Sequence, residues 1–466
     1  MMVRSTALSF RLTTGVAKVL PANSIASTFF AVASLFLMKK CRTGFLTVTI
    51  AIGGAIVCLA QNPAPSDAGT TAPDFEELPE LKASEILKPE ILKGPNCTVR
   101  EPVPTSSGMN QFTIDSDFGV FQADGNEMLL QRVKEIYMIA KLKDVSRTDE
   151  FEQSLVTAAK GPYNAAKNVV KDPANAVSSA SKGLMKFFGR TEQTIKHVAK
   201  GETQKDTDGN KMEQMIGYTK AKGKIAVSMG IDPYSTNSVL QKELDNVAWA
   251  SWAGGFTFSA ATFPISGPVG ATLTITDVSS AIGDLLSQKS PAELKAINGS
   301  ALRNMGASAK DTERLLNNTA FTPTEQTKFV FNLKSLDGVA NRGVFVRAAA
   351  EKSSDEADAV FCVQTSALMS QLHKGEHPLA RIVMIENFPV CIAKDGKVIV
   401  ALQWDYAAWT SGAAAFSGEV QKLAGESGGH KPMLVVISGQ MSPRLQQELQ
   451  TRGITVHDRF SPGPLK

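Results

Sequence analysis

The chain has 466 residues, a length typical of two or three domains. Hydrophobic residues make up 43% and charged residues 20% of it, which supplies a packed core and excludes wholesale disorder. The formal net charge of +4 comes from residues 1–60, which carry six basic side chains and no acidic one; the remaining chain holds 43 of the 49 Lys and Arg residues against 45 Asp and Glu. Because that remainder has no basic excess to neutralise phosphates, we expect no nucleic-acid partner.

Residues 38–60 resemble a bacterial secretory signal peptide. A positively charged start, Met38 to Arg42, precedes an uncharged and mostly apolar segment, residues 44–57. Small residues then stand at positions −3 and −1 of a cleavage site between Ala60 and Gln61. We therefore predict an exported protein, periplasmic or associated with the cell envelope.

This interpretation makes Met38 the natural start and residues 1–37 an upstream extension that results from an early start codon. Three alternatives to a cleaved signal peptide remain open for the leader: retention as an N-terminal anchor, lipidation at Cys58, and a role as an organellar transit peptide.

The elements that follow predict an α+β multidomain chain. Residues 61–108 are rich in Pro and lack a sustained apolar period, so we expect a flexible linker. Residues 109–376 are predicted to form a mainly helical domain, opening with a hairpin over 112–121 and a helix over 127–142. Cap residues predict further helix starts at Asp149, Ser235, Ser290, Thr322 and Ser353.

Residues 377–466 are predicted to form a small C-terminal α/β domain, because strand and helix patterns alternate there. Expected strands are 381–385, 398–404, 433–437 and 454–457, and expected helices are 413–424 and 443–450. A turn at 394–397 favours a hairpin, and the last strands and helix form a βαβ unit.

Two segments of the helical region concern membranes. The segment from Lys160 to Lys200 contains eight basic and two acidic residues, with apolar residues between them. Such a helix can lie on an anionic membrane surface, although a solvated basic face is the alternative. The residues that carry this candidate surface are Lys182, Lys186, Phe187, Phe188 and Arg190.

Residues 246–276 contain 31 residues without a charge and predict a neutral helical hairpin. It is expected to pack in the core of the helical domain, and membrane insertion is the alternative.

Candidate chemistry is sparse in this sequence. Ser438 and Ser442 stand between a predicted strand and a helix, where α/β sheets bind ligands, but an N-cap role also explains Ser442. Ser427 lies in a G-x-S-x-G string, yet a helix precedes it and a strand follows, the reverse of a nucleophile elbow. His373 and His377 have the four-residue spacing of metal ligands, but the helix is predicted to end there and no third ligand is evident.

The leader removes two of the five cysteines, which leaves Cys97, Cys362 and Cys391 in the exported chain. An odd number allows one bridge, and Cys362–Cys391 is the candidate disulfide because Cys97 falls in the predicted linker. Three unpaired thiols are the alternative.

Together these features favour a non-catalytic protein that binds an anionic membrane surface or an envelope protein partner. No cofactor is expected. A hydrolase or metal-dependent enzyme with its site in the C-terminal domain is one alternative, and a membrane-inserting protein acting through residues 246–276 is another.

The leader gives a direct prediction. N-terminal sequencing of the protein from its native host is expected to start at Gln61, because charge, apolar length and small residues are correctly spaced only from Met38. A mature chain that still contains residues 44–60 would instead establish an anchored protein.

Overall fold

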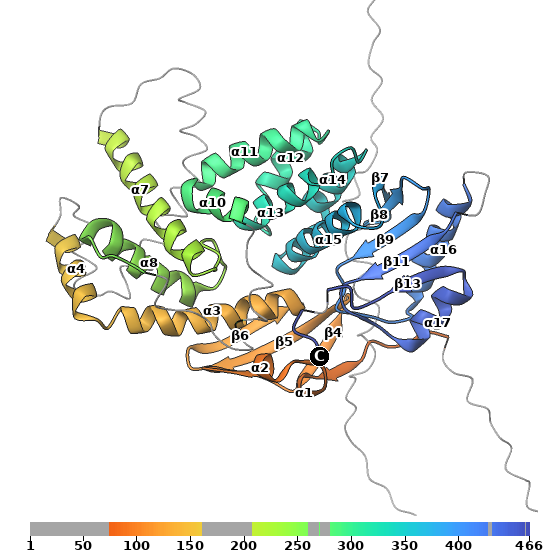
Figure 1. Ribbon diagram of the computed structural model, residues 1–466, viewed down its shortest axis with the longest axis horizontal. Coiled ribbons are helices and arrows are strands. Elements are labelled where there is room, and N and C mark those ends of the chain that lie inside the picture. The colour runs from red at the N-terminus through yellow and green to blue at the C-terminus, as the bar shows by residue number, and fades with distance from the viewer. Residues whose placement is uncertain (1–73, 161–206, 260–269, 271–279, 427–430, 462) are drawn as a thin grey trace, which may run out of the picture. The chain divides into compact units, whose positions relative to one another are not determined.

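The computed structural model describes residues 74–160, 207–259, 270, 280–426, 431–461 and 463–466 (Figure 1). Within these ranges the chain is a mixed α and β protein, with a sheet in its C-terminal region. The predicted extension 1–37, the signal peptide 38–60 and the basic surface residues from Lys182 to Arg190 lie outside the described residues.

The first described region is a sheet organised around its longest strand, β5 (Met109–Ser116). β5 pairs in antiparallel fashion with β3, β4 and β6, and its turn to β6 is the predicted hairpin. The other strands and two short helices are β1 (Glu80–Lys82), α1 (Ala83–Ile86), α2 (Pro89–Leu92), β2 (Lys93–Gly94), β3 (Cys97–Val99), β4 (Pro102–Ser106) and β6 (Gly119–Asp124).

The prediction of a flexible linker over 61–108 is therefore wrong for its described part. Leu87, Ile91 and Val103 are fully buried in one hydrophobic cluster with Phe112 of β5. The strands of this part are short, and Pro102 and Pro104 stand in β4, so no apolar period of useful length appears in the sequence. Their order comes from pairing with each other and with β5.

A layer of helices follows, which Figure 1 shows as the yellow to cyan part of the chain. Ser290 and Thr322 form capping boxes with Glu293 and Glu325, each ahead of a Pro, as the cap chemistry predicts. The helices are α3 (Asn126–Val145), α4 (Asp149–Lys160), α7 (Thr207–Ser228), α8 (Ser238–Gly254), α10 (Ser280–Gln288), α11 (Pro291–Asn304), α12 (Ala309–Leu316), α13 (Pro323–Lys334), α14 (Arg342–Lys352) and α15 (Glu356–Lys374).

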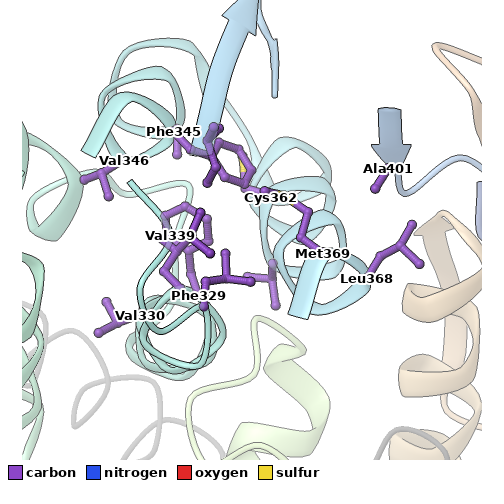
Figure 2. Packing of buried hydrophobic residues seen from close by; sticks show 14 of the residues in the cluster. Phe329, Val330, Val339, Phe345, Val346, Cys362, Leu368, Met369 and Ala401 are labelled. Carbon is purple, nitrogen blue, oxygen red and sulfur yellow. The ribbon is translucent and has the colours of Figure 1, made fainter. Parts of the chain in front are cut away.

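Aromatic and aliphatic side chains of α13, α14 and α15 form the core of the second half of this layer. Phe329 and Phe345 meet edge to face with ring centroids 5.2 Å apart. Figure 2 shows Cys362 of α15 beside Phe345, and Met369 about two turns further along the same helix. Truncating a fully buried aromatic side chain of this kind to Ala lowers the free energy of unfolding by about 3 to 5 kcal/mol.

A buried ion pair joins the start of the helical layer to its end. Arg132 of α3 contacts Glu135 at 2.8 Å and Glu356 of α15 at 3.1 Å. Glu135 also accepts hydrogen bonds from Ser235 and Asn237, which precede α8. Because every charge has a partner, this network orients α3, α8 and α15 without leaving a buried ion unpaired.

The first nine residues of the neutral segment 246–276, residues 246–254, belong to α8. Val247, Ala248 and Ala250 are fully buried there, in a cluster with α3 residues such as Leu142. These three side chains pack in the core, while residues 251–259 are partly or fully exposed, and residues 260–269 and 271–279 lie outside the described residues. Among the described helices none is long and apolar enough to cross a membrane.

The C-terminal region is a five-stranded sheet in the order β13-β11-β9-β8-β7. β11 runs parallel to β9 and β13, while β8 is antiparallel to β7 and β9. The segment β11–α17–β13 is the predicted βαβ unit. The elements are β7 (Leu379–Ile385), β8 (Phe388–Ala393), β9 (Val398–Leu402), β10 (Tyr406–Ala407), α16 (Ser411–Gly425), β11 (Met433–Ile437), β12 (Gln440–Met441), α17 (Pro443–Thr451) and β13 (Ile454–His457).

The last residues of the chain return to the first sheet. Leu465 forms a β-bridge with Leu87, the Lys88 N–H donates to the Pro464 carbonyl at 2.9 Å, and the Lys466 N–H donates to the Ile86 carbonyl at 2.9 Å. The described N-terminal and C-terminal segments thus fold together, with the helical layer as a long insertion between them.

Candidate functional site

The candidate site lies where the parallel strands β9 and β11 end. After these strands the chain forms the short parallel pair β10 and β12 and then enters α16 and α17. Thr410 and Ser442 are the N-caps of the two helices. In open α/β sheets this edge is where ligands bind, since helix N-termini present unpaired N–H groups there.

An extended segment of the chain itself occupies this edge. We call residues 74–79 the strap. The Glu76 N–H donates to the Trp409 carbonyl at 2.8 Å, and the Trp409 N–H donates back to Glu76 Oε2 at 2.6 Å. The Ser442 hydroxyl donates to the same Oε2 at 2.6 Å, and Arg444 Nη2 donates to the Asp74 carbonyl at 2.7 Å.

We call the groups that hold the strap the strap site: the backbone of Trp409, the Ser442 hydroxyl and the Arg444 guanidinium. Its electrostatics favour a carboxylate. Glu76 lies at the starts of both α16 and α17, where helix dipoles stabilise negative charge. The Arg452 guanidinium lies over the Trp409 ring, 4.4 Å from its centroid, and its charge is paired with Glu448. Burial raises the pKa of Tyr406, and the nearby charge of Glu76 raises it further.

Ser442 is therefore a binding residue in this structure. Its Oγ accepts the Leu445 N–H at 3.0 Å, which is the predicted N-cap bond, and its O–H is given to Glu76. Ser438 is 6% exposed and donates to the Trp404 carbonyl at 2.9 Å. Both hydroxyl protons are thus held by acceptors of this chain, and neither acceptor is a His side chain.

Asp405, in the connection between β9 and β10, holds the first sheet against this edge. It is 1% exposed, and its Oδ2 accepts the N–H groups of Asn110 at 3.0 Å and Asn126 at 2.9 Å. Its Oδ1 accepts Gln403 Nε2 at 3.1 Å. Burial raises the pKa of Asp405 to about 7, and the charge of Glu127 adds to this, although the Asn110 and Asn126 donors oppose it.

The backbone around Asp405 is equally constrained. Gly439 passes so close that a Cβ there would lie 2.1 Å from the Asp405 carbonyl oxygen, so a side chain cannot be accommodated without a backbone shift. No local sequence pattern identifies Asp405 as a structural residue, because its partners Asn110 and Asn126 stand 295 and 279 residues away.

The two histidines do not share one helix, because α15 ends at Lys374 and His377 lies beyond it. His373 lies in the last turn of α15, and its Nδ1 accepts the Leu379 N–H at 3.0 Å. Burial lowers the pKa of His373, and the charge of Lys394 lowers it further. The His377 N–H donates to the Leu372 carbonyl and closes the helix end. In the described ranges no three His, Cys, Asp or Glu side chains gather in a way that could hold a metal ion.

The predicted Cys362–Cys391 disulfide is not formed, because Cys97, Cys362 and Cys391 are all buried free thiols. Cys362 packs on α15 with its sulfur 3.7 Å from the Ser353 hydroxyl, and Cys391 stands in β8. Burial raises the pKa of both Cys362 and Cys391 to about 12, which keeps the thiols protonated and unreactive. Cys97 is buried in β3 rather than placed in a linker.

Other sequence candidates fall elsewhere. Ser427, the cleavage residues Ala60 and Gln61, and the basic surface residues lie outside the described residues. A separate pocket of about 370 Å³ is lined by Lys220, Lys224, Ser287, Gln288 and Lys289. It lies at the C-terminal end of α10, whose free carbonyls disfavour an anion, so we regard it as a weaker candidate.

Comparison of the chain with family models, curated proteins and solved structures found no match.

Asp405 makes stability depend on pH in a defined direction. Between about pH 4 and pH 7 the folded chain keeps a proton at Asp405 that the unfolded chain has lost, so this contribution to stability falls as pH rises through that window. In the Asp405→Asn variant the free energy of unfolding should lose this pH dependence, which is worth up to about 1.4 kcal/mol per pH unit. The hydrogen bonds can be kept, because the Gln403 amide can flip and accept from the new Asn side chain. Urea unfolding at pH 5 and pH 8 measures this pH dependence.

The matched control for that experiment is Asp395→Asn, in the exposed turn between β8 and β9. It should follow the pH dependence of the unmodified protein. An Asp405→Asn protein with an unchanged slope would show that Asp405 does not titrate in this window.

Proposed function

We propose that this is an exported cell-envelope protein that binds a protein partner without catalysing a reaction. In this proposal a mainly helical domain precedes a small C-terminal α/β domain, and the α/β domain contributes the binding edge. The single observation that carries the proposal is the seating of Glu76 in the strap site.

That observation indicates binding because the groups at the site are donors arranged for a carboxylate. The Trp409 N–H and the Ser442 hydroxyl both donate to Oε2 of Glu76. Arg444 donates to the backbone carbonyl of Asp74, two residues before Glu76. Peptides that bind at a sheet edge combine main-chain hydrogen bonds with pockets for particular side chains. The strap uses one main-chain bond, from the Glu76 N–H to the Trp409 carbonyl, and one side-chain carboxylate.

The alternative of a hydrolase has less support from these contacts. A nucleophilic serine needs a general base within hydrogen-bond reach of its hydroxyl. Ser438 donates to a backbone carbonyl, and Ser442 is engaged both as a helix cap and with Glu76.

Site-specific photo-crosslinking in the native host tests the partner. A photoreactive residue at Ser411, exposed in the first turn of α16, should give one discrete adduct of higher mass. The matched control is Lys310, exposed in α12 and distant in sequence from the strap site. No adduct at Ser411, or the same adducts at both positions, would contradict a partner at this edge.

A second candidate function, binding to an anionic membrane surface, is favoured by the net charge of +6 between Lys160 and Lys200. A basic residue near such a surface contributes about 1 kcal/mol, and salt screens the effect. Changing three residues to Gln should therefore weaken binding to anionic vesicles strongly and leave the melting temperature nearly unchanged. The residues are Lys182, Lys186 and Arg190.

The control triple variant removes three charges from exposed helix positions, namely Lys310, Lys334 and Lys352. It should bind vesicles like the unmodified protein. Equal binding of the unmodified protein to neutral and anionic vesicles, or equal loss in both triple variants, would rule out a specific basic surface.

A further inference from the structure

We propose that the strap site is a receptor for an acidic, extended segment of a partner protein, and that the strap occupies it in cis until such a segment replaces it. This inference rests on the proposed partner-binding function and adds the chemistry of the ligand. The ligand must offer a carboxylate and an N–H on one residue, and a carbonyl two residues earlier.

The bound strap itself demonstrates that chemistry. Glu76 presents its N–H to the Trp409 carbonyl and its carboxylate to Trp409 and Ser442, while Asp74 presents its carbonyl to Arg444. Hydrogen bonds to a charged acceptor are about twice as strong as neutral ones, so the carboxylate is the main determinant of binding.

No residue of the strap is buried as core residues are. Phe75 and Leu78 remain 42% and 38% exposed, so part of their apolar surface stays in water. Segments with few buried apolar contacts open at low cost compared with the rest of a fold. The strap can therefore leave while the sheet stays folded.

The groups left behind then favour another carboxylate. When Glu76 leaves, the Trp409 N–H and the Ser442 hydroxyl lose their shared acceptor. A second carboxylate restores both charge-assisted hydrogen bonds at once.

The receptor side is also preformed. Ser442 is fixed by the Leu445 N–H and by its own N–H, which donates to the Ala407 carbonyl at 2.8 Å. The Trp409 ring makes a cation–π contact with the Arg452 guanidinium. A site that does not need to rearrange binds its ligand with a smaller entropic loss.

The experiment uses the purified exported chain and a labelled nonapeptide with the sequence of residues 73–81. Glu76→Ala removes the anchor, and Glu77→Ala is the matched control because Glu77 is the adjacent, exposed carboxylate. Ser442→Asp keeps an N-cap acceptor for α17 but replaces the hydroxyl donor with a negative charge. Hydrogen exchange at the Glu76 and Trp409 amides reports release of the strap, and fluorescence anisotropy reports peptide binding.

Hydrogen exchange at the two amides should be faster in Glu76→Ala and Ser442→Asp but unchanged in Glu77→Ala. The peptide should bind Glu76→Ala about tenfold or more tightly than the unmodified protein, in which the tethered strap competes at an effective concentration of about millimolar. Ser442→Asp should not bind it, nor should Glu76→Ala bind a peptide carrying Ala in place of Glu76. Melting temperatures confirm that each variant is folded.

Three results would overturn the inference. The strap amides exchange equally in Glu76→Ala and Glu77→Ala, the peptide binds all proteins alike or none, or Glu76→Ala forms dimers that consume the site with a second copy of the chain. Any of these leaves the crosslinking result at Ser411 intact, so the acidic-segment inference can fail while partner binding stands.

Discussion

The buried carboxylate of Asp405 is the interaction on which the arrangement at this edge depends. One of its oxygens accepts N–H groups from β5 and from the start of α3, and the other accepts from Gln403. A carboxylate at the start of α3 also compensates the positive end of that helix, whose N-cap, Gly125, has no side chain to do so. The first sheet, the helical layer and the C-terminal sheet therefore meet at a single side chain.

The same connection holds the strap. Asp405 and Trp409 lie four residues apart, with β10 between them paired to β12. The Gln440 N–H donates to the Asp405 carbonyl at 2.9 Å and fixes the backbone from the other side. The short segment from Asp405 to Trp409 thus binds both Asn110 and Glu76, which lie far away in the sequence. These contacts help to hold the described N-terminal region against the C-terminal region, although the helices lie between them in the sequence.

The sequence predicted several elements that short-range chemistry determines, although the predicted helix starts at Ser235 and Ser353 lie two residues before the N-caps Asn237 and Asp355. Ser442 before Pro443 and Thr322 before Pro323 are N-caps, and 433–437 and 454–457 are strands. It did not predict order in residues 80–106, because strands of two to five residues show no period and depend on partners such as β5. Nor did it predict the roles of Asp405 and Glu76, since a carboxylate's function follows from distant donors that leave no local pattern.

The contrast between a fixed receptor and a loosely held occupant distinguishes this edge from ordinary core packing. Asp405, Trp409 and Ser442 are each buried and bonded on several sides, so the edge keeps its shape whatever lies against it. Glu76, by comparison, is attached through its own amide and carboxylate, between two apolar side chains that stay partly in water. The strap is thus held by polar bonds that depend on the carboxylate and by apolar contact that does not. Loss of the carboxylate removes the first kind of contact and leaves the second, so the two contributions to holding the strap can be separated at Glu76.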